Sequence, residues 1–306
     1  MVADNKKRNS VRRQKGWVLP VVLILVVALV FGIIYATNAE GIKKLIGQFG
    51  SPGTIPSGRT IEVHFIDVGQ GDSALIKLPD GKTMLIDAGP TLSVIELENY
   101  LGSLGIKKID YLIATHPHED HIGGMAAIIA DYEIGEIWAP KVEHDTRTYE
   151  LFLNAVKKKG LAINTASAGK VIYSAQECTV SVLYPGVSSL PADINDSSAI
   201  ILVEYGSVSF LFTGDAGVSI IASACKKQVD VLKVSHHGSY LGTDDDLVKK
   251  LKPNIAIISC AADNPYGYPH KEVMAALKDT NMRRTDVDGT IVVTSDGKRI
   301  QTEWGK

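Results

Sequence analysis

The sequence has few cysteines, and after residue 59 it contains no internal repeat or low-complexity run. The 3 cysteines, at positions 178, 225 and 260, exclude a disulfide-rich scaffold and a Cys-x-x-Cys zinc ribbon, and they allow at most one disulfide. The 306 residues are 45% hydrophobic and 22% charged. These values are ordinary for a globular protein, and they argue against disorder, collagen or coiled coil as the main content.

Positive charge is scarce outside the first sixteen residues. The chain has a formal net charge of −2, but residues 1–16 hold six Lys and Arg against one Asp, a net +5, so the remainder carries −7. By charge alone, the body of the protein does not have the basic surface typical of nucleic-acid-binding domains.

One long hydrophobic run is present at residues 17–37, WVLPVVLILVVALVFGIIYAT, and it carries no charge. A run of this length can cross a hydrocarbon core of about 30 Å. Because the cations precede it, the positive-inside rule predicts a cytoplasmic N-terminus and an extracellular body. The alternative is a cleaved signal peptide, whose apolar region is normally shorter, about 7–15 residues.

These patterns divide the chain into four parts. We predict a basic cytoplasmic N-terminus at 1–16, a single transmembrane anchor at 17–37, a Gly-, Ser- and Pro-containing linker at 38–59 and a folded domain at 60–306. The protein is thus expected in the cell membrane with its folded domain outside. Nothing in the sequence identifies a protein partner.

Within 60–306, short apolar strands outnumber helices. Helical spacing is expected at 91–105, 122–132, 148–160, 244–252 and 271–280, with strand groups between these segments and a terminal hairpin at 291–304. Two sheets with helices on their outer faces fit this order better than one doubly wound sheet, although periodicity alone leaves both open.

The segment His116-Pro117-His118-Glu119-Asp120-His121 follows the apolar strand YLIAT. Imidazoles and a carboxylate at this density suit Zn, Fe or Mn and indicate two ions rather than one. The alternative is a solvated surface turn. Three of the chain's 8 histidines in one turn argue against it.

This HxHxDH pattern resembles the metallo-β-lactamase superfamily, and three later motifs extend the likeness. They are LIDAG with Asp87, LFTGDAG with Asp215, and LKVSHHGS with His236 and His237. The resemblance implies that His116, His118, Asp120, His121, Asp215 and His236 bind metal. It implies that Asp87 supports the histidines and Asp215 bridges two ions, with His237 as the alternative to His236.

Other segments resemble one branch of that superfamily, the hydrolase-like domain of ComEC-type competence proteins. The matching segments are FIDVGQGDSALI, NDSSAIILV, LFTGDAG, VLKVSHHGS and NPYGYPHKEV, and the match covers essentially residues 60–290. This resemblance implies an α/β fold, the αββα four-layer sandwich, and a metal-dependent hydrolase with two divalent ions, Zn or Mn. The related domain is thought to degrade one DNA strand.

One departure concerns the first ion. No His lies between His144 and His236, so the superfamily's middle His ligand is absent, and the corresponding segment is Asn195-Asp196-Ser197-Ser198. Oxygen from Asn195 or Asp196, or water, would then complete the site. A harder ligand set shifts preference from Zn towards Mn.

Two further groups have open roles. In the VGQGD loop, Asp67, Gln70 and Asp72 either face the site or serve as turn residues beside two glycines. His270 either donates a proton to a leaving oxygen or binds phosphate, or else it caps a helix that begins at Lys271.

The expected mechanism uses hydroxide generated between the two ions, because divalent metals lower the pKa of bound water. Asp120 and Asp215 would hold the second ion and the nucleophile, and His270 would act near the leaving group. The first expectation is a phosphodiesterase acting on extracellular DNA, against which the −7 charge of the body weighs.

Three alternatives stay open. One is a surface phosphoesterase acting on cell-wall polymers, of the phosphorylcholine or teichoic-acid type. Another is a non-enzymatic binding module with a degenerate site, which the missing middle His allows. A β-lactamase or lactonase fits the late motifs less well.

Overall fold

The computed structural model describes residues 59–185 and 193–305. The predicted basic terminus, transmembrane anchor and all but the last residue of the linker lie outside these residues. Within the described ranges, no helix is both long and apolar enough to cross a membrane. The three cysteines are free and buried.

The described residues form two mixed sheets. The first has eight strands in the order β15-β14-β1-β2-β3-β4-β5-β6. In chain order they are β1 (Ile61–Phe65), β2 (Ala74–Lys77), β3 (Thr83–Ile86), β4 (Lys108–Ile113), β5 (Glu133–Ala139), β6 (Ile163–Thr165), β14 (Thr290–Ser295) and β15 (Ile300–Gly305). The second has seven, in the order β13-β12-β11-β10-β9-β8-β7. They are β7 (Val171–Ala175), β8 (Cys178–Tyr184), β9 (Ile200–Tyr205), β10 (Val208–Phe212), β11 (Val231–Lys233), β12 (Ile255–Ile258) and β13 (Asn281–Arg284).

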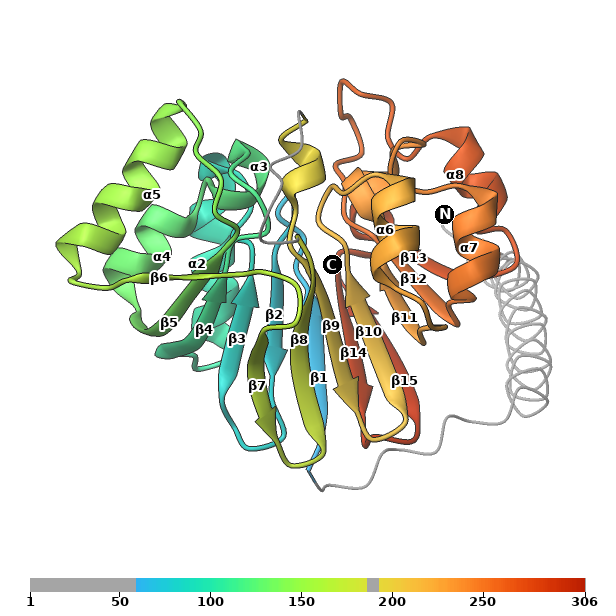
Figure 1. The fold of residues 1–306 in the computed structure, drawn as a ribbon, viewed down its shortest axis with the longest axis horizontal. Helices are drawn as coiled ribbons and strands as arrows, with labels where there is room; N and C mark the ends of the chain where they lie inside the picture. The colour runs from blue at the N-terminus through green and yellow to red at the C-terminus, as the bar shows by residue number, and fades with distance from the viewer. Residues whose placement is uncertain (1–58, 186–192, 306) are drawn as a thin grey trace, which may run out of the picture. The chain divides into compact units, whose positions relative to one another are not determined.

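Helices cover the outer faces of both sheets (Figure 1). Those packed on the first sheet are α2 (Val94–Ser103), α3 (Glu119–Ile122), α4 (Met125–Asp131) and α5 (Arg147–Lys158), and those on the second are α6 (Val218–Ala224), α7 (Asp245–Leu251) and α8 (Lys271–Ala276). Four shorter elements complete the set: α9 (Thr285–Asp288) and the 3-10 turns η1 (Thr91–Ser93), η2 (Asn195–Ser197) and η3 (Ser235–Gly238).

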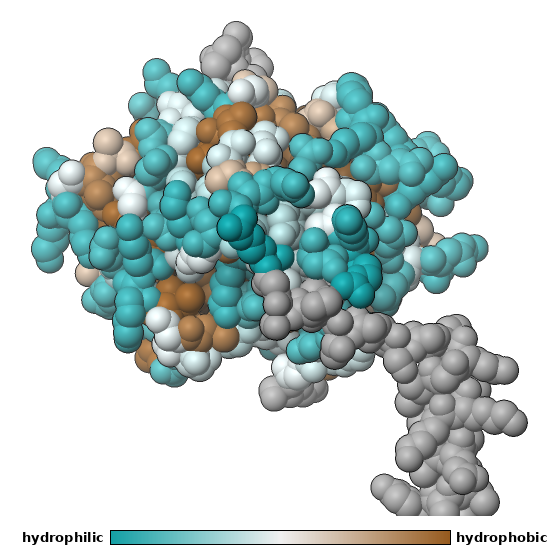
Figure 2. Space-filling model, turned by 90° about the horizontal axis from the view of Figure 1, so that it is seen from below, coloured by the Kyte–Doolittle hydropathy of each residue, from teal (hydrophilic) through white to brown (hydrophobic). Residues whose placement is uncertain are grey.

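The main core lies between the two sheets, where Phe65 of β1 stacks on Phe212 of β10 with ring centroids 5.8 Å apart. Two further apolar clusters lie beneath the helices on the outer faces. The predicted αββα sandwich is therefore confirmed. The surface at the lower end of the sheets is mainly hydrophilic, with apolar patches between (Figure 2).

The direction of the strands determines where functional side chains can lie close together. β3 through β6 pair in parallel, and so do β10 through β13. The side chains of β3, β10, β11 and β12 are buried, as the apolar runs IAII in β12 and VSFLF in β10 require. Since the carboxyl ends of parallel strands lie at one edge of a sheet, the segments after β3, β4, β10 and β11 are brought towards one region.

His64 in β1 gives this fold a pH dependence. Its Nδ1 lies 2.8 Å from the Tyr100 hydroxyl, and burial, with Lys77 nearby, lowers its pKa from 6.5 to about 4. Between these two pH values His64 is protonated in the unfolded chain but neutral in the folded chain. Stability that is present above pH 6.5 is therefore lost as the pH falls towards 4. Urea denaturation should show that, from pH 7 to pH 4.5, the free energy of unfolding falls by about 2 kcal/mol more in the native chain than in His64→Gln. Equal losses in the two proteins would contradict this assignment.

Candidate metal centre

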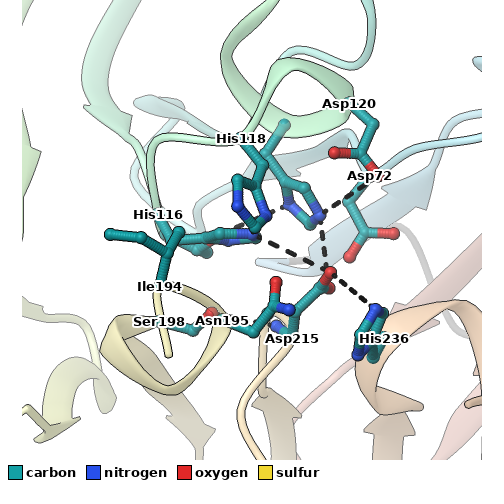
Figure 3. A network of polar contacts seen from close by, with 12 residues as sticks. Asp72, His116, His118, Asp120, Ile194, Asn195, Ser198, Asp215 and His236 are labelled. Carbon is teal, nitrogen blue, oxygen red and sulfur yellow. Dashed lines mark hydrogen bonds and ion pairs between the residues drawn. The ribbon is translucent and has the colours of Figure 1, made fainter. Parts of the chain in front are cut away.

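Four segments that follow parallel strands meet between the two sheets. Asp87 follows β3, the stretch 116–121 follows β4, Asp215 follows β10 and the pair His236–His237 follows β11. His237 and Asp120, which are 117 positions apart in sequence, come within hydrogen-bond distance. The fold therefore gathers the predicted motifs into one polar network (Figure 3).

The tightest part of this network holds Asp120, His121, Asp215 and His237, whose candidate ligand atoms all lie within 4.8 Å of one another. His237 Nε2 is 3.1 Å from Asp120 Oδ2, and His121 Nε2 is 3.2 Å from Asp215 Oδ1. All but Asp120 are buried. We call the space between these four side chains the second-ion position.

His116 and His118 form another part of the site. His116 Nε2 lies 3.0 Å from His118 Nδ1 and 3.8 Å from Asp215 Oδ2 (Figure 3). We call their side of Asp215 the first-ion position. Asp215 contacts members of both groups, and this is the geometry that a bridging carboxylate requires.

The adjacent histidines 236 and 237 have different surroundings. Both have a left-handed backbone, with φ of 51° and 55°, which is uncommon for residues other than glycine. His237 is buried, and its Nδ1 lies 3.0 Å from the Ser259 carbonyl. The His236 side chain is 18% exposed, with Nε2 3.8 Å from Asp215 Oδ2 and 3.3 Å from the Tyr268 hydroxyl. The geometry favours His237, rather than the predicted His236, as a ligand at the second-ion position.

Asp87 holds His121 in place. Its Oδ2 lies 2.8 Å from His121 Nδ1 and accepts the Thr115 hydroxyl at 2.7 Å, and its Oδ1 accepts the Thr115 amide at 2.8 Å. With Nδ1 occupied in this way, His121 turns Nε2 towards Asp215. Carboxylates that fix the far nitrogen of a ligating histidine have this function in metal sites.

The segment without the middle His lies in η2. Asp196 Oδ1 accepts the Gly217 backbone amide at 2.9 Å. The Ser197 hydroxyl donates to the Ile194 carbonyl at 2.6 Å, and the backbone amide of Asn195 donates to the Asp193 carboxylate. The next residue, Ser198, accepts the backbone amide of Asp215 at 3.0 Å. Sequence reasoning included Ser198 in this segment but gave it no role.

The VGQGD loop divides between turn and site. Asp67 Oδ1 accepts the Gly69 amide at 3.2 Å, an ordinary turn contact, and Gln70 Oε1 accepts the Ala261 amide at 3.2 Å. Asp72 instead points inward, with Oδ1 3.3 Å from His237 Nδ1. Of the three candidates in this loop, Asp72 contacts the second-ion group.

Gly71 allows that loop to approach. A Cβ at this position would lie 2.3 Å from the Asp120 carbonyl oxygen and 2.8 Å from Pro90 Cδ. Gly71→Ala should therefore push the loop away from Asp120, destabilising the fold by about 1–3 kcal/mol and weakening Mn²⁺ binding. Chemical denaturation and calorimetric Mn²⁺ titration measure the two effects. Gly69→Ala, where no atom lies within 4 Å, controls for the left-handed backbone alone. Equal affinity in Gly71→Ala and the native chain would contradict the close approach.

His270 lies farther out. Its Nδ1 accepts the Tyr240 amide at 3.2 Å, and its ring packs edge-on against Tyr268, centroids 5.0 Å apart. It occupies the N-cap position of α8, but its side chain makes no capping hydrogen bond. Tyr268 thus lies between His270 and His236. The predicted role of His270 near a leaving group stays a prediction.

The pKa values of the histidines at this site are set by burial and by the neighbouring charges. Burial lowers the pKa of His121, but the carboxylates, Asp215 first, outweigh it and raise that pKa well above its usual range. The same balance raises the pKa of His237 to about 10. Burial and the charge of His121 lower the pKa of His116 well below its usual range. His116 is thus kept neutral, the form in which imidazole binds metals.

The residues present fit divalent ions. Among the described residues, neither His121 Nε2 nor Asp215 Oδ1, both buried, has a satisfying hydrogen-bond partner, although the two atoms face each other 3.2 Å apart at the second-ion position. Buried polar atoms are normally satisfied, so this pair needs a partner. A cation bound by imidazole nitrogen and carboxylate oxygen would supply one, and this ligand set suits Zn, Mn or Fe.

Comparison with known proteins gives the same grouping. Residues 66–262 match the family model described as the metallo-beta-lactamase superfamily. The chain is 34% identical over 253 residues to ComE operon protein 3 of Bacillus subtilis (strain 168), covering 75% of this chain and 32% of that protein. It is 31% identical over 260 residues to Recombination protein 2 of Haemophilus influenzae, covering 81% and 30%. The chain thus spans about a third of the length of these relatives.

Among solved structures, the metallo-beta-lactamase fold protein YhfI from Bacillus subtilis aligns with a TM-score of 0.55 at 14% identity, covering 78% of this chain and all of that one. CmlA, a β-hydroxylase, aligns with a TM-score of 0.50 at 14% identity, covering 84% of this chain and 59% of that one. At these identities the likeness establishes the fold alone.

Proposed function

As the chain belongs to the metallo-beta-lactamase superfamily, we propose that it is a metal-dependent phosphodiesterase that acts on extracellular DNA. The observation that carries the proposal is the convergence of His116, Asp120, His121, Asp215 and His237 on one centre. The similarity to Recombination protein 2, whose name refers to recombination, supports the substrate class. The proposal includes two divalent ions, Zn or Mn, and an extracellular domain held at the membrane by residues 17–37.

Divalent ions bound at such a centre activate water and neutralise charge that develops on a phosphoryl group. The chain's own residues hold the ions and orient the ligating side chains. Asp215 joins the two ion positions, and Asp87 fixes His121. His236 is partly exposed and hydrogen-bonded to Tyr268, so it is placed to contact an oxygen of the substrate.

Two cavities flank the centre and bear on the substrate. One, of about 320 Å³, lies beside His116, with Tyr149 and Phe152 among its walls and both Lys141 and Glu143 at its lining. Its apolar and aromatic walls suit the faces of a nucleobase. The other, of about 730 Å³, lies beside Asp120.

The direct test is cleavage of labelled single- and double-stranded DNA by the full chain in detergent, with Mn²⁺, with Zn²⁺ and with chelator. Metal-dependent cleavage that Asp215→Ala loses supports the proposal. A folded, metal-loaded protein that leaves both DNA substrates intact overturns it.

The second cavity favours a second candidate, a phosphoesterase acting on cell-wall polymers that carry a cationic group such as phosphorylcholine. Glu96, Glu119 and Asp120 line this cavity together with Tyr266. Carboxylates and an aromatic ring attract a quaternary ammonium and repel a polyanion. Release of choline from wall polymer by the native chain, but not by Asp215→Ala, would favour this candidate over DNA.

A further inference from the structure

A buried lysine lies behind the metal centre. Lys233, the last residue of β11, is 4% exposed. Lysine is almost never fully buried unless it is paired. Its Nζ lies 2.8 Å from Asp72 Oδ1 and donates to the Val234 carbonyl at 3.1 Å. Asp72 belongs to the loop between β1 and β2 of the other sheet, so this ion pair joins the two sheets.

Asp72 also contacts the second-ion group. The carboxylate oxygen that binds Lys233 lies 3.3 Å from His237 Nδ1, and the Asp72 amide donates to the Asp120 carbonyl at 3.1 Å. Together with the Ser259 carbonyl, 3.0 Å from the same nitrogen, Asp72 holds the Nδ1 side of His237. His237 Nε2 is thereby directed at Asp120 and Asp215.

The charges near the site give Lys233 a second effect. Asp72 and Asp87 are buried beside His121, and together with Asp120 and Asp215 they make four carboxylates around one centre. Two divalent ions would balance these four charges. Lys233 then adds one positive charge, which suits a site that receives an anionic phosphodiester.

We propose that Lys233 and Asp72 form a positioning pair, in which Lys233 fixes the Asp72 carboxylate and Asp72 fixes His237 for the second ion. Neither residue needs to touch the substrate. The inference rests on the metal centre of the proposed function but not on DNA as the substrate. The lysine of the strand VDVLKVS had no role in the sequence reading, because its partner lies in a loop 161 positions earlier.

The test compares Asp72→Asn, Lys233→Met and the double variant in the full chain, by calorimetric Mn²⁺ titration and by thermal unfolding without metal. Asp72→Asn should weaken the second Mn²⁺ by about 10–100-fold, the usual effect of losing the partner that orients a ligand. Lys233→Met should mainly lower the unfolding temperature of the metal-free protein, because it leaves the buried Asp72 carboxylate without its lysine partner. The double variant should regain the unfolding temperature of the native metal-free protein, but its affinity for the second Mn²⁺ should stay as weak as that of Asp72→Asn.

Lys108→Met removes an ion pair with Asp110, 3.1 Å long and half-exposed, and is the matched control. Its Mn²⁺ affinity should equal that of the native chain. The double variant holds no unpaired charge, so it still tests the affinity if a single variant does not fold. Native affinity in both Asp72→Asn and the double variant would overturn the positioning role alone. A native chain that binds no Mn²⁺ would overturn the metal centre together with this inference.

Discussion

Replacing Asp215 by asparagine is expected to lower metal-dependent phosphodiester cleavage by well over the ~10–100-fold that loss of a ligand's hydrogen-bonding partner usually costs. Asp215 lies 3.2 Å from His121, 3.7 Å from His237 and 3.8 Å from His116. An amide keeps the shape of this side chain but not its charge. Both ion positions would therefore lose a ligand, and initial rates of oligonucleotide cleavage at saturating Mn²⁺ measure the loss.

Asp110→Asn is the control for this substitution. Asp110 lies in β4, away from the metal centre, where its carboxylate accepts the Thr83 amide at 2.9 Å. The control should retain native cleavage. A folded Asp215→Asn variant with a rate within a few-fold of the native chain would show that Asp215 does not bridge the ions.

Removing divalent ions is expected to lower the unfolding temperature by roughly 5–10 °C for each ion lost, because an ion present at a hundred times its Kd adds about 2.7 kcal/mol to stability. The physical cause is the cluster of buried carboxylates of Asp72, Asp87 and Asp215, whose negative charges Lys233 and the neighbouring histidines offset only in part when no divalent ion is bound. Calorimetric melting of the full chain with Mn²⁺ and with chelator gives the difference.

The same melting experiment on Asp215→Asn should show a much smaller gain from Mn²⁺, whereas Asp110→Asn should keep the native gain. If chelation leaves the melting of the native chain unchanged, the buried carboxylates are compensated by protein groups alone, and the centre is not a metal site.

The parts of this protein that sequence could predict are those encoded locally. The HxHxDH stretch lies within six residues after one strand, and its side chains form the site with Asp87 and Asp215, each at the end of its own strand. The order of strands and helices favoured two sheets with helices on their outer faces, but it was the resemblance to the superfamily that implied the four-layer sandwich. The strands β6, β7 and β13 were not predicted, and β6 and β13 are short, partly exposed and carry no apolar pattern.

Other features depend on contacts that no spacing encodes. His236 and His237 are neighbours, and only their left-handed backbone separates the buried imidazole from the partly exposed one. Asp72 has the surroundings of a turn residue in sequence, and its role becomes visible when Lys233 of the other sheet meets it. Ser198 is one of several serines in the sequence, and the structure distinguishes it because its hydroxyl accepts the backbone amide of Asp215.

Anomalous diffraction from crystals grown with Mn²⁺ tests most directly whether Asp215 joins two ion positions. We predict two peaks, one among Asp120, His121, Asp215 and His237 and the other beside His116, His118 and Asp215. A single peak, or a second-ion peak bound by His236 with His237 turned away, would contradict the assignment of this centre.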